Sequence, residues 1–248
     1  MKKLHLTFMG LIAGLMLAGG VQAAETGVHL EQSGVDLGDQ ASLQRGAKYY
    51  MSYCSGCHSL KYQRYSRIGE DLGLTEEEVK QNLIFKEGTQ IGGNVITGMD
   101  AELGKKLFGK APPDLSVISR VRGNDWVYTY LKSFYLDESR PLGWNNTVFP
   151  NASMPNPLWE LQGLQHAEYG KADATGERPV AGLAVTQVGR LKPAEFDQVA
   201  RDISAFLAYT GEPAGLKRQS LGVWVLLFLA FFTFLAWLVK KEYWKDVH

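Results

Sequence analysis

Apolar residues recur at helical spacing in two segments that lie far apart along the chain. The first segment spans residues 42–53 and has a one-sided set of small and apolar residues, namely Leu43, Gly46, Ala47, Tyr50 and Tyr53. The second begins at Pro193 and has an apolar stripe with helical spacing, namely Phe196, Val199, Ala200, Ile203, Phe206 and Leu207. Gly211 and Pro213 end this second segment. The pattern predicts two helices, and the glycine in the first permits a close crossing.

The chain between these segments is rich in loops. Most of its glycine, proline and asparagine residues fall in residues 88–98, 141–157 and 170–189. A third helix is predicted over residues 125–135, and Thr75-x-x-Glu78 has the pattern of a capping box at the start of another helix. Roughly 190 residues suit a single domain. We therefore expect one mainly α-helical domain with long loops.

Residues 1–23 have the features of a secretory signal peptide. Lys2 and Lys3 form a basic start, an apolar stretch continues to Leu17, and small residues lead to Ala23. We expect cleavage after Ala23 and export of the remaining chain. An uncleaved N-terminal anchor is the alternative, but the apolar stretch is short and rich in glycine.

A second uniformly apolar stretch lies near the C-terminus. Residues 219–239 carry no charge and have apolar side chains on every face, unlike the one-sided pattern of a core helix. At about 1.5 Å per residue, this length crosses a hydrocarbon layer of about 30 Å. We predict a transmembrane anchor over 219–239, between a domain at 24–215 and a short tail at 240–248. The lysines in this tail favour the cytoplasmic side of the membrane.

The charge balance argues against nucleic acid as a partner. The whole chain has 26 basic and 26 acidic residues, and loss of Lys2 and Lys3 with the signal peptide leaves 24 against 26, a net charge of −2. One local set of carboxylates, here called the acidic group, consists of Glu70, Asp71, Glu76, Glu77 and Glu78. It is either a solvated helix start or a docking patch for a basic protein.

Both cysteines of the chain lie in the sequence Cys54-Ser55-Gly56-Cys57-His58. This is the attachment motif of a c-type haem. The two thiols can form thioethers on one edge of the porphyrin, and the adjacent histidine can coordinate the iron. We expect one covalent haem c, with His58 as an axial ligand. Because bacterial haem attachment takes place outside the cytoplasmic membrane, we expect the domain in the periplasm, tethered to the inner membrane.

Three other chemistries use a close pair of cysteines. A thioredoxin-like redox pair requires a βαβ context, which the pattern here does not provide. A structural zinc site requires a second pair of Cys or His ligands at recognisable spacing. A plain disulfide is compatible with export. The adjacent His58, together with the signal peptide, favours haem over all three.

The iron needs a second axial ligand opposite His58, unless that position is open for oxygen or peroxide chemistry. Met154 is the preferred candidate, because Pro150, Pro155 and Pro157 hold its loop extended and free of helix. Methionine ligation favours ferrous iron and hence electron transfer. The remaining candidates are Met99, which is the runner-up, and His29 and His166.

The chain resembles the cytochrome c1 family over nearly its whole mature length, and the matching segments occur in the same order as in that family. The matching segments are Arg45-Gly46, the haem motif, Ala111-Pro112-Pro113-Asp114-Leu115-Ser116, the Phe149-Pro150…Met154-Pro155 loop, Asp202-Ile203-Ser204-Ala205-Phe206-Leu207, Glu212-Pro213 and the C-terminal anchor. The haem motif is common to c-type cytochromes. The Pro-Pro-Asp-Leu-Ser segment and the Glu-Pro turn before the anchor are much more specific.

The resemblance implies a class I cytochrome c-like haem domain, with His58 and Met154 as the axial ligands. It places the carbonyls of Pro112 and Pro113 near the His58 imidazole, where one of them can accept its N–H. Arg122 matches a basic residue near a haem propionate, and Arg120 lies close enough to be confused with it. Trp126 matches an aromatic residue near the haem.

Three departures from the family pattern are visible. The stretch Gly123-Asn124-Asp125 is shorter than usual, which affects the assignments of Arg122 and Trp126. The loop of Met154 is shortened as well. A cysteine pair that some relatives use as a disulfide is absent.

The function implied is that of an electron-transfer subunit of quinol–cytochrome c reductase. The haem would take one electron from a Rieske iron–sulfur protein and pass it to a soluble c-type cytochrome. The anchor would pack in lipid beside the cytochrome b subunit of a dimeric complex, and no side chain here would act as acid, base or nucleophile. The alternatives are a stand-alone tethered cytochrome that donates to an oxidase, and a haem sensor with an exchangeable sixth ligand.

Overall fold

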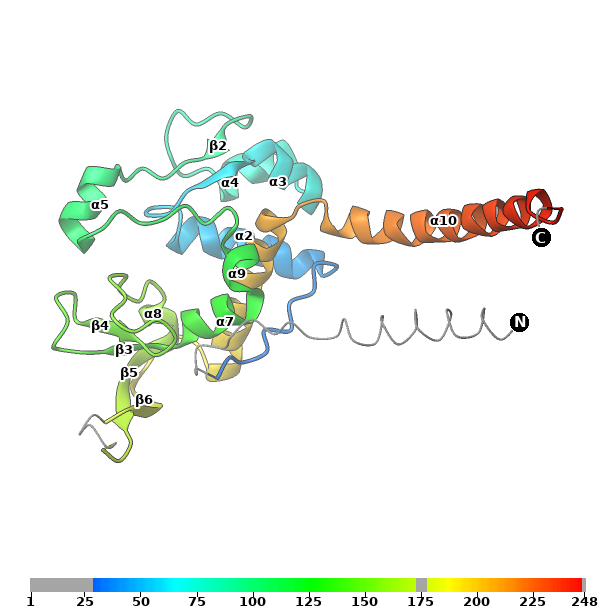
Figure 1. The fold of residues 1–248 in the computed structure, drawn as a ribbon. Coiled ribbons are helices and arrows are strands. Elements are labelled where there is room, and N and C mark those ends of the chain that lie inside the picture. Colours follow the sequence, from blue (N-terminus) through cyan, green and yellow to red (C-terminus); the bar gives the residue numbers. More distant parts are fainter. Residues whose placement is uncertain (1–28, 173–177, 247–248) are drawn as a thin grey trace.

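The computed structural model describes residues 29–172 and 178–246, which form a mainly helical domain followed by a long projecting helix (Figure 1). The predicted signal peptide lies outside the described residues. The helices are α2 (Gln40–Tyr53), α3 (Tyr65–Leu72), α4 (Glu76–Asn82), α5 (Ala101–Phe108), α6 (Ile118–Arg122), α7 (Asn124–Lys132), α8 (Trp159–Gln162), α9 (Pro193–Gly211) and α10 (Gly215–Tyr243). The strands are β1 (Leu60–Arg64), β2 (Asn94–Val95), β3 (Phe134–Leu136), β4 (Trp144–Asn146), β5 (Gly163–Tyr169) and β6 (Val180–Val188).

The two predicted helices are confirmed as α2 and α9, and they cross in close contact. A Cβ atom added at Gly46 would collide with the backbone carbonyl of Asp202 and would lie 2.8 Å from Cβ of Phe206. Only glycine therefore fits at this crossing. The carboxylate of Asp202 is almost fully buried and accepts hydrogen bonds from Ser42 Oγ at 2.6 Å and Arg45 Nε at 2.7 Å. This ion pair joins α2 to α9.

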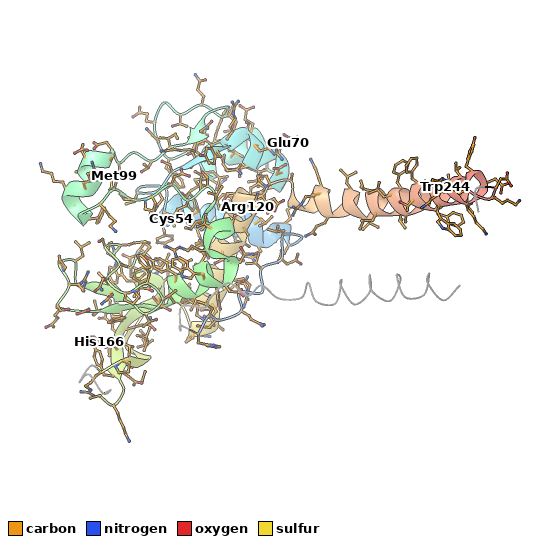
Figure 2. All side chains as sticks on the ribbon, in the orientation of Figure 1. Cys54, Glu70, Met99, Arg120, His166 and Trp244 are labelled. Carbon is orange, nitrogen blue, oxygen red and sulfur yellow. The ribbon has the colours of Figure 1, made fainter. Side chains whose placement is uncertain are left out.

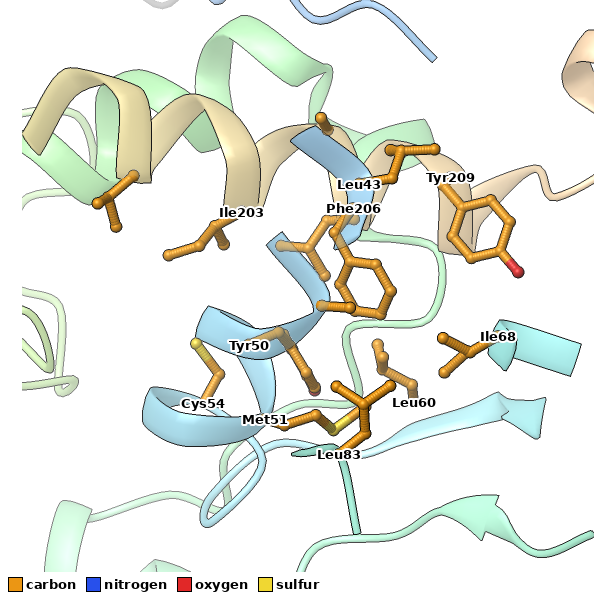
Figure 3. Packing of buried hydrophobic residues seen from close by; sticks show 14 of the residues in the cluster. Leu43, Tyr50, Met51, Cys54, Leu60, Ile68, Leu83, Ile203, Phe206 and Tyr209 are labelled. Carbon is orange, nitrogen blue, oxygen red and sulfur yellow. The ribbon is translucent and has the colours of Figure 1, made fainter. Parts of the chain in front are cut away.

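The main hydrophobic core lies where α2 and α9 meet β1 and α3 (Figure 3). Tyr50 of α2 and Phe206 of α9 are fully buried, with ring centroids 5.7 Å apart. Leu60 and Ile68 close the core from β1 and α3. Cys54 lies at the edge of this core, so the end of α2 is held by packing on several sides.

We name two parts of the domain for reference. The first lobe, residues 40–113, contains α2–α5, β1 and β2; the second lobe, residues 124–188, contains α7, α8 and β3–β6. Figure 1 shows them on either side of the centre of the domain. Helix α9 contacts both α2 of the first lobe and α7 of the second.

The second lobe contains a sheet where the sequence pattern suggested loops and a longer helix. Its four strands have the order β4-β3-β5-β6, with β5 and β6 forming an antiparallel hairpin. The helix expected over residues 125–135 ends at Lys132, because residues 134–136 pair with β4. Strand β6 falls within the expected loop at 170–189 and pairs with β5. These pairings join segments distant in sequence, which a local pattern does not reveal.

Helix α10 projects from the domain (Figure 1). Large apolar side chains are exposed along its length. Its segment Lys217–Tyr243 is 27 residues long and has a mean hydropathy of 2.4. Within the part of the chain that the structure describes, it is the one helix long and apolar enough to cross a membrane. The predicted anchor at 219–239 lies inside it.

Candidate haem site

The haem motif forms one compact turn directly after α2. The N–H groups of Cys57 and His58 both donate to the carbonyl of Cys54, at 3.0 and 2.8 Å. The hydroxyl of Tyr50 donates to the carbonyl of His58 at 2.9 Å, so a buried residue of α2 supports the end of the turn. Both thiols are free. The turn therefore presents two thiols and one imidazole together, from a single short segment.

The two thiols do not have the electrostatics of a reactive redox pair. Burial, with a smaller contribution from Cys57, raises the pKa of Cys54 to about 12. Burial also raises the pKa of Cys57. A reactive Cys-x-x-Cys pair requires the opposite shift, towards the thiolate. The environment thus argues against a thioredoxin-like role.

His58 is buried and held in one orientation. Its Nδ1 lies 2.7 Å from the carbonyl oxygen of Pro113, as expected for one of the two proline carbonyls. Because a carbonyl can only accept, Nδ1 carries the proton and the lone pair of Nε2 is free to coordinate a metal. Burial lowers the pKa of His58, which outweighs the opposing effect of the Pro113 bond. The imidazole is therefore neutral, the state that a metal ligand requires.

Met154 lies within the second lobe, against α7. The hydroxyl of Tyr130 donates to Sδ of Met154 at 3.5 Å. The loop before Met154 is tied to the same helix by Asn146, which is fully buried. Asn146 donates to the carbonyl of Tyr130 at 2.9 Å, and its Oδ1 accepts from the N–H groups of Val148 and Phe149 at 2.9 and 3.1 Å.

Two further buried asparagines support this loop. Asn145 accepts at 2.8 Å from the N–H of Asn151, a residue with a positive φ of 65°. Asn156 accepts from the N–H of Leu158 at 2.9 Å and donates to Gln162 of α8 at 2.8 Å. The sequence reasoning did not identify these supporting residues. The signal available was the unusual number of asparagines in a proline-rich loop.

The other candidate ligands have different surroundings (Figure 2). Sδ of Met99 lies 3.6 Å from the position of a Cβ added at Gly104, a glycine that also packs against Pro112. Met99 is thus on the side of the Pro112-Pro113 segment, which contacts His58. His166 lies on the exposed β5–β6 hairpin, where Nδ1 is 2.8 Å from Thr186 Oγ1. His29 is exposed at the start of the described chain.

The two arginines, which the sequence left ambiguous, point to different neighbours. The guanidinium of Arg122 lies over the rings of Trp126 and Phe149, at 5.0 and 5.7 Å from their centroids. Arg120 packs against the end of α9, with Cγ 3.2 Å from the position of a Cβ added at Gly211. Arg122 and Trp126 therefore belong with the Met154 loop, and Arg120 does not.

The donor set fits a c-type haem. Two free thiols and a neutral imidazole with a free Nε2 come from the end of α2, and a soft thioether sulfur comes from a braced loop of the opposite lobe. Donors of these kinds would attach a porphyrin through thioethers and coordinate its iron.

Comparison with known proteins is consistent with this chemistry. A family model described as the Cytochrome C1 family matches residues 32–93 and 101–247, a range that includes the haem motif and Met154 but not Met99. The chain is 51% identical to cytochrome c1 of Allochromatium vinosum, over 100% of both chains. It is 41% identical to the ammonia monooxygenase gamma subunit of Nitrosomonas europaea, over 89% of this chain and 90% of that one. It is 28% identical to cytochrome b/c1 of Bradyrhizobium diazoefficiens, over 85% of this chain and 34% of that one.

Proposed function

The chain belongs to the cytochrome c1 family, and on this premise we propose that it is the electron-carrying subunit of a membrane-bound quinol–cytochrome c reductase. Family membership implies a c-type haem. We propose one such group, attached to Cys54 and Cys57, with His58 and Met154 as axial ligands. The observation that carries the proposal is the oriented, neutral His58 on one lobe, with Met154 braced on the other.

When bound, the haem supplies a one-electron couple. His58 contributes a fixed Nε2, because its Nδ1 proton is held by Pro113. The thioether of Met154 favours the ferrous state. Arg122, rather than Arg120, is proposed to neutralise a propionate, because it lies with Trp126 beside the Met154 loop. No side chain of this chain is assigned a role as acid, base or nucleophile.

The proposed electron donor is a Rieske iron–sulfur protein, and the proposed acceptor is a soluble c-type cytochrome. Of the acidic group, Glu78 caps α4 and Glu76 pairs with Lys80 at 2.7 Å, so both serve the helix itself. Glu77 accepts from Gln81 of α4 at 3.0 Å, and Asp71 accepts from Tyr209 at 2.8 Å. Glu70 is exposed and is the carboxylate of the acidic group that we assign to docking of the acceptor.

The membrane arrangement follows from α10. We propose that residues 219–239 cross the bacterial inner membrane, with residues 24–215 in the periplasm, residues 240–248 in the cytoplasm and residues 1–23 removed as a signal peptide. The name of the Bradyrhizobium relative joins cytochrome b and c1, which supports packing of this helix beside a cytochrome b subunit. The complex is proposed to be dimeric.

Purification in mild detergent tests the assignment to a complex. Native membranes are solubilised, and the chain is captured through a C-terminal tag. We expect co-purification of a b-type cytochrome and an iron–sulfur protein, and quinol-dependent reduction of a soluble c-type cytochrome. Recovery of the chain alone would support a stand-alone tethered cytochrome and overturn the proposal.

Absorption spectra test the ligand assignment. We expect a low-spin spectrum with a far-red methionine–iron band that is lost in Met154→Ala and retained in the matched variant Met99→Ala. A high-spin wild-type spectrum that readily binds carbon monoxide would indicate an open position, as in a haem sensor or an oxygen-activating subunit, and would contradict the proposal.

A further inference from the structure

The hydroxyl of Tyr130 has an unusual partner. Tyr130 lies in the last turn of α7, and its hydroxyl donates to the thioether sulfur of Met154 at 3.5 Å. Among the described residues, this is the one hydrogen bond that the hydroxyl makes. A thioether is a weak acceptor, so a buried phenol is seldom committed to it alone. The arrangement indicates a role for the contact beyond packing.

The ring of Tyr130 is held by two aromatic neighbours, and its backbone by an asparagine. Trp126, one turn earlier, stacks on it at a centroid distance of 4.9 Å and an interplanar angle of 9°. Phe134 of β3 meets it edge-on at 5.0 Å. Asn146 binds the backbone carbonyl of Tyr130 at 2.9 Å and also holds the loop that leads to Met154. Helix and loop are therefore tied together at the point where hydroxyl and sulfur meet.

The hydroxyl is also in the right protonation state to donate. A tyrosine hydroxyl has an ordinary pKa of about 10, so it carries its proton across the physiological range. The thioether sulfur has two lone pairs. One can bind a metal while the other accepts the hydroxyl proton of Tyr130.

We propose that Tyr130 is a positioning residue that orients Met154 and raises the reduction potential of the site. The inference rests on the proposed function, because it requires Met154 to be the axial ligand. A hydrogen bond to the sulfur withdraws electron density from it. Ferric iron depends more on electron donation than ferrous iron, so the contact disfavours the ferric state. The same contact restrains rotation of the methionine side chain and slows its displacement.

The test is Tyr130→Phe in the intact complex, which removes the hydroxyl and keeps the ring. The matched control is Tyr128→Phe, because Tyr128 is buried on the same helix and its hydroxyl contacts Lys132 instead. We expect Tyr130→Phe to shift the ferric-to-ferrous ratio about threefold towards ferric, a fall in potential of about 28 mV at 59 mV per tenfold for one electron. Exogenous imidazole should displace the methionine faster in Tyr130→Phe than in wild type or the control.

A second variant covers the case in which Tyr130→Phe fails to assemble. Incorporation of fluorotyrosine at position 130 keeps the shape and gives a stronger hydrogen-bond donor, so the potential should rise. An unchanged potential in either variant, with the methionine–iron band retained, overturns the inference and leaves the proposed function intact. Absence of that band in the wild-type protein would instead overturn the ligand assignment itself.

Discussion

The His58 side and the Met154 side of the site are held by different kinds of contact. His58 follows α2 within a few residues, and the turn around it is closed by backbone hydrogen bonds and by Tyr50 of the same helix. Met154 contacts Tyr130 of α7, and the asparagines of its loop tie that loop to α7 and α8. The turn of His58 is therefore built mainly from neighbouring residues, with Pro113 as a distant contact to the ring, whereas the loop of Met154 depends on contacts with α7 and α8.

This difference predicts two kinds of failure. Damage to α2 or to its crossing with α9 removes the platform of the haem motif, so both sides of the site are lost together. Damage to the asparagine network releases Met154 alone and leaves covalent attachment intact. The four predictions below test this contrast, from the largest expected effect to the smallest.

Gly46→Ala should have the largest effect, because an added Cβ collides with the backbone of Asp202 and forces α2 away from α9. We expect the free energy of unfolding to fall by about 3 kcal/mol. The amount of protein that stains for covalent haem should fall strongly as well. Gly92→Ala is the matched control, since a Cβ there meets no atom within 4 Å and the residue lies outside the haem motif. Denaturant unfolding and haem staining measure the two variants. Equal stability of both would contradict the close crossing as the basis of the His58 side.

Asn146→Ala should release the Met154 side alone. It leaves the carbonyl of Tyr130 and the N–H groups of Val148 and Phe149 without their partner in a buried setting. We expect the free energy of unfolding to fall by about 2 kcal/mol. The methionine–iron band should weaken, while covalent attachment of the haem stays complete. Asn82→Ala, at an exposed position of α4, is the control. Loss of covalent haem in Asn146→Ala would show that the two sides are not separable.

Asp202→Asn tests the ion pair between α2 and α9. The substitution keeps the shape but removes the charge that Arg45 and Ser42 contact. The side chain of Arg45 is 46% exposed. We therefore expect the free energy of unfolding to fall by a moderate amount, about 1–2 kcal/mol. Thermal unfolding should shift downward while the methionine–iron band at room temperature stays unchanged. A selective loss of that band would place Asp202 with the Met154 side instead.

The smallest expected effect is a pH dependence from Asp137, which lies in the turn before β4. The hydroxyl of Ser139 is the largest cause that lowers the pKa of Asp137 below its ordinary value of 3.8, and Asn145 adds to the effect. The ionised carboxylate therefore stabilises the fold above the ordinary pKa, and this contribution is lost as the pH falls through the lower folded value. We expect Asp137→Asn to lower the free energy of unfolding by less than about 1 kcal/mol at pH 7, and by still less at pH 3. A pH-independent difference in unfolding free energy would contradict this account.

The spacing of apolar residues and the capping signals predicted the main helices of the domain correctly. The apolar spacing of residues 42–53 and 193–211 corresponds to α2 and α9, and the capping box at Thr75 begins α4 as expected. The β5–β6 hairpin was not predicted, because its pairing joins residues about twenty positions apart across a glycine-rich stretch. The ambiguity between Arg120 and Arg122 could not be resolved from sequence either. Two arginines two residues apart have the same local pattern but lie against different helices.

The sequence by itself determined the chemistry that depends on adjacent residues. The spacing of Cys54, Cys57 and His58 specifies haem attachment, and the uncharged run at 219–239 specifies a helix suited to lipid. Only the tertiary structure decided which groups surround Met154, and it revealed Tyr130 and the asparagine network. The physical reason is that adjacent residues are positioned by covalent geometry. The neighbours of Met154 are brought together by packing and hydrogen bonds between segments that no local pattern relates.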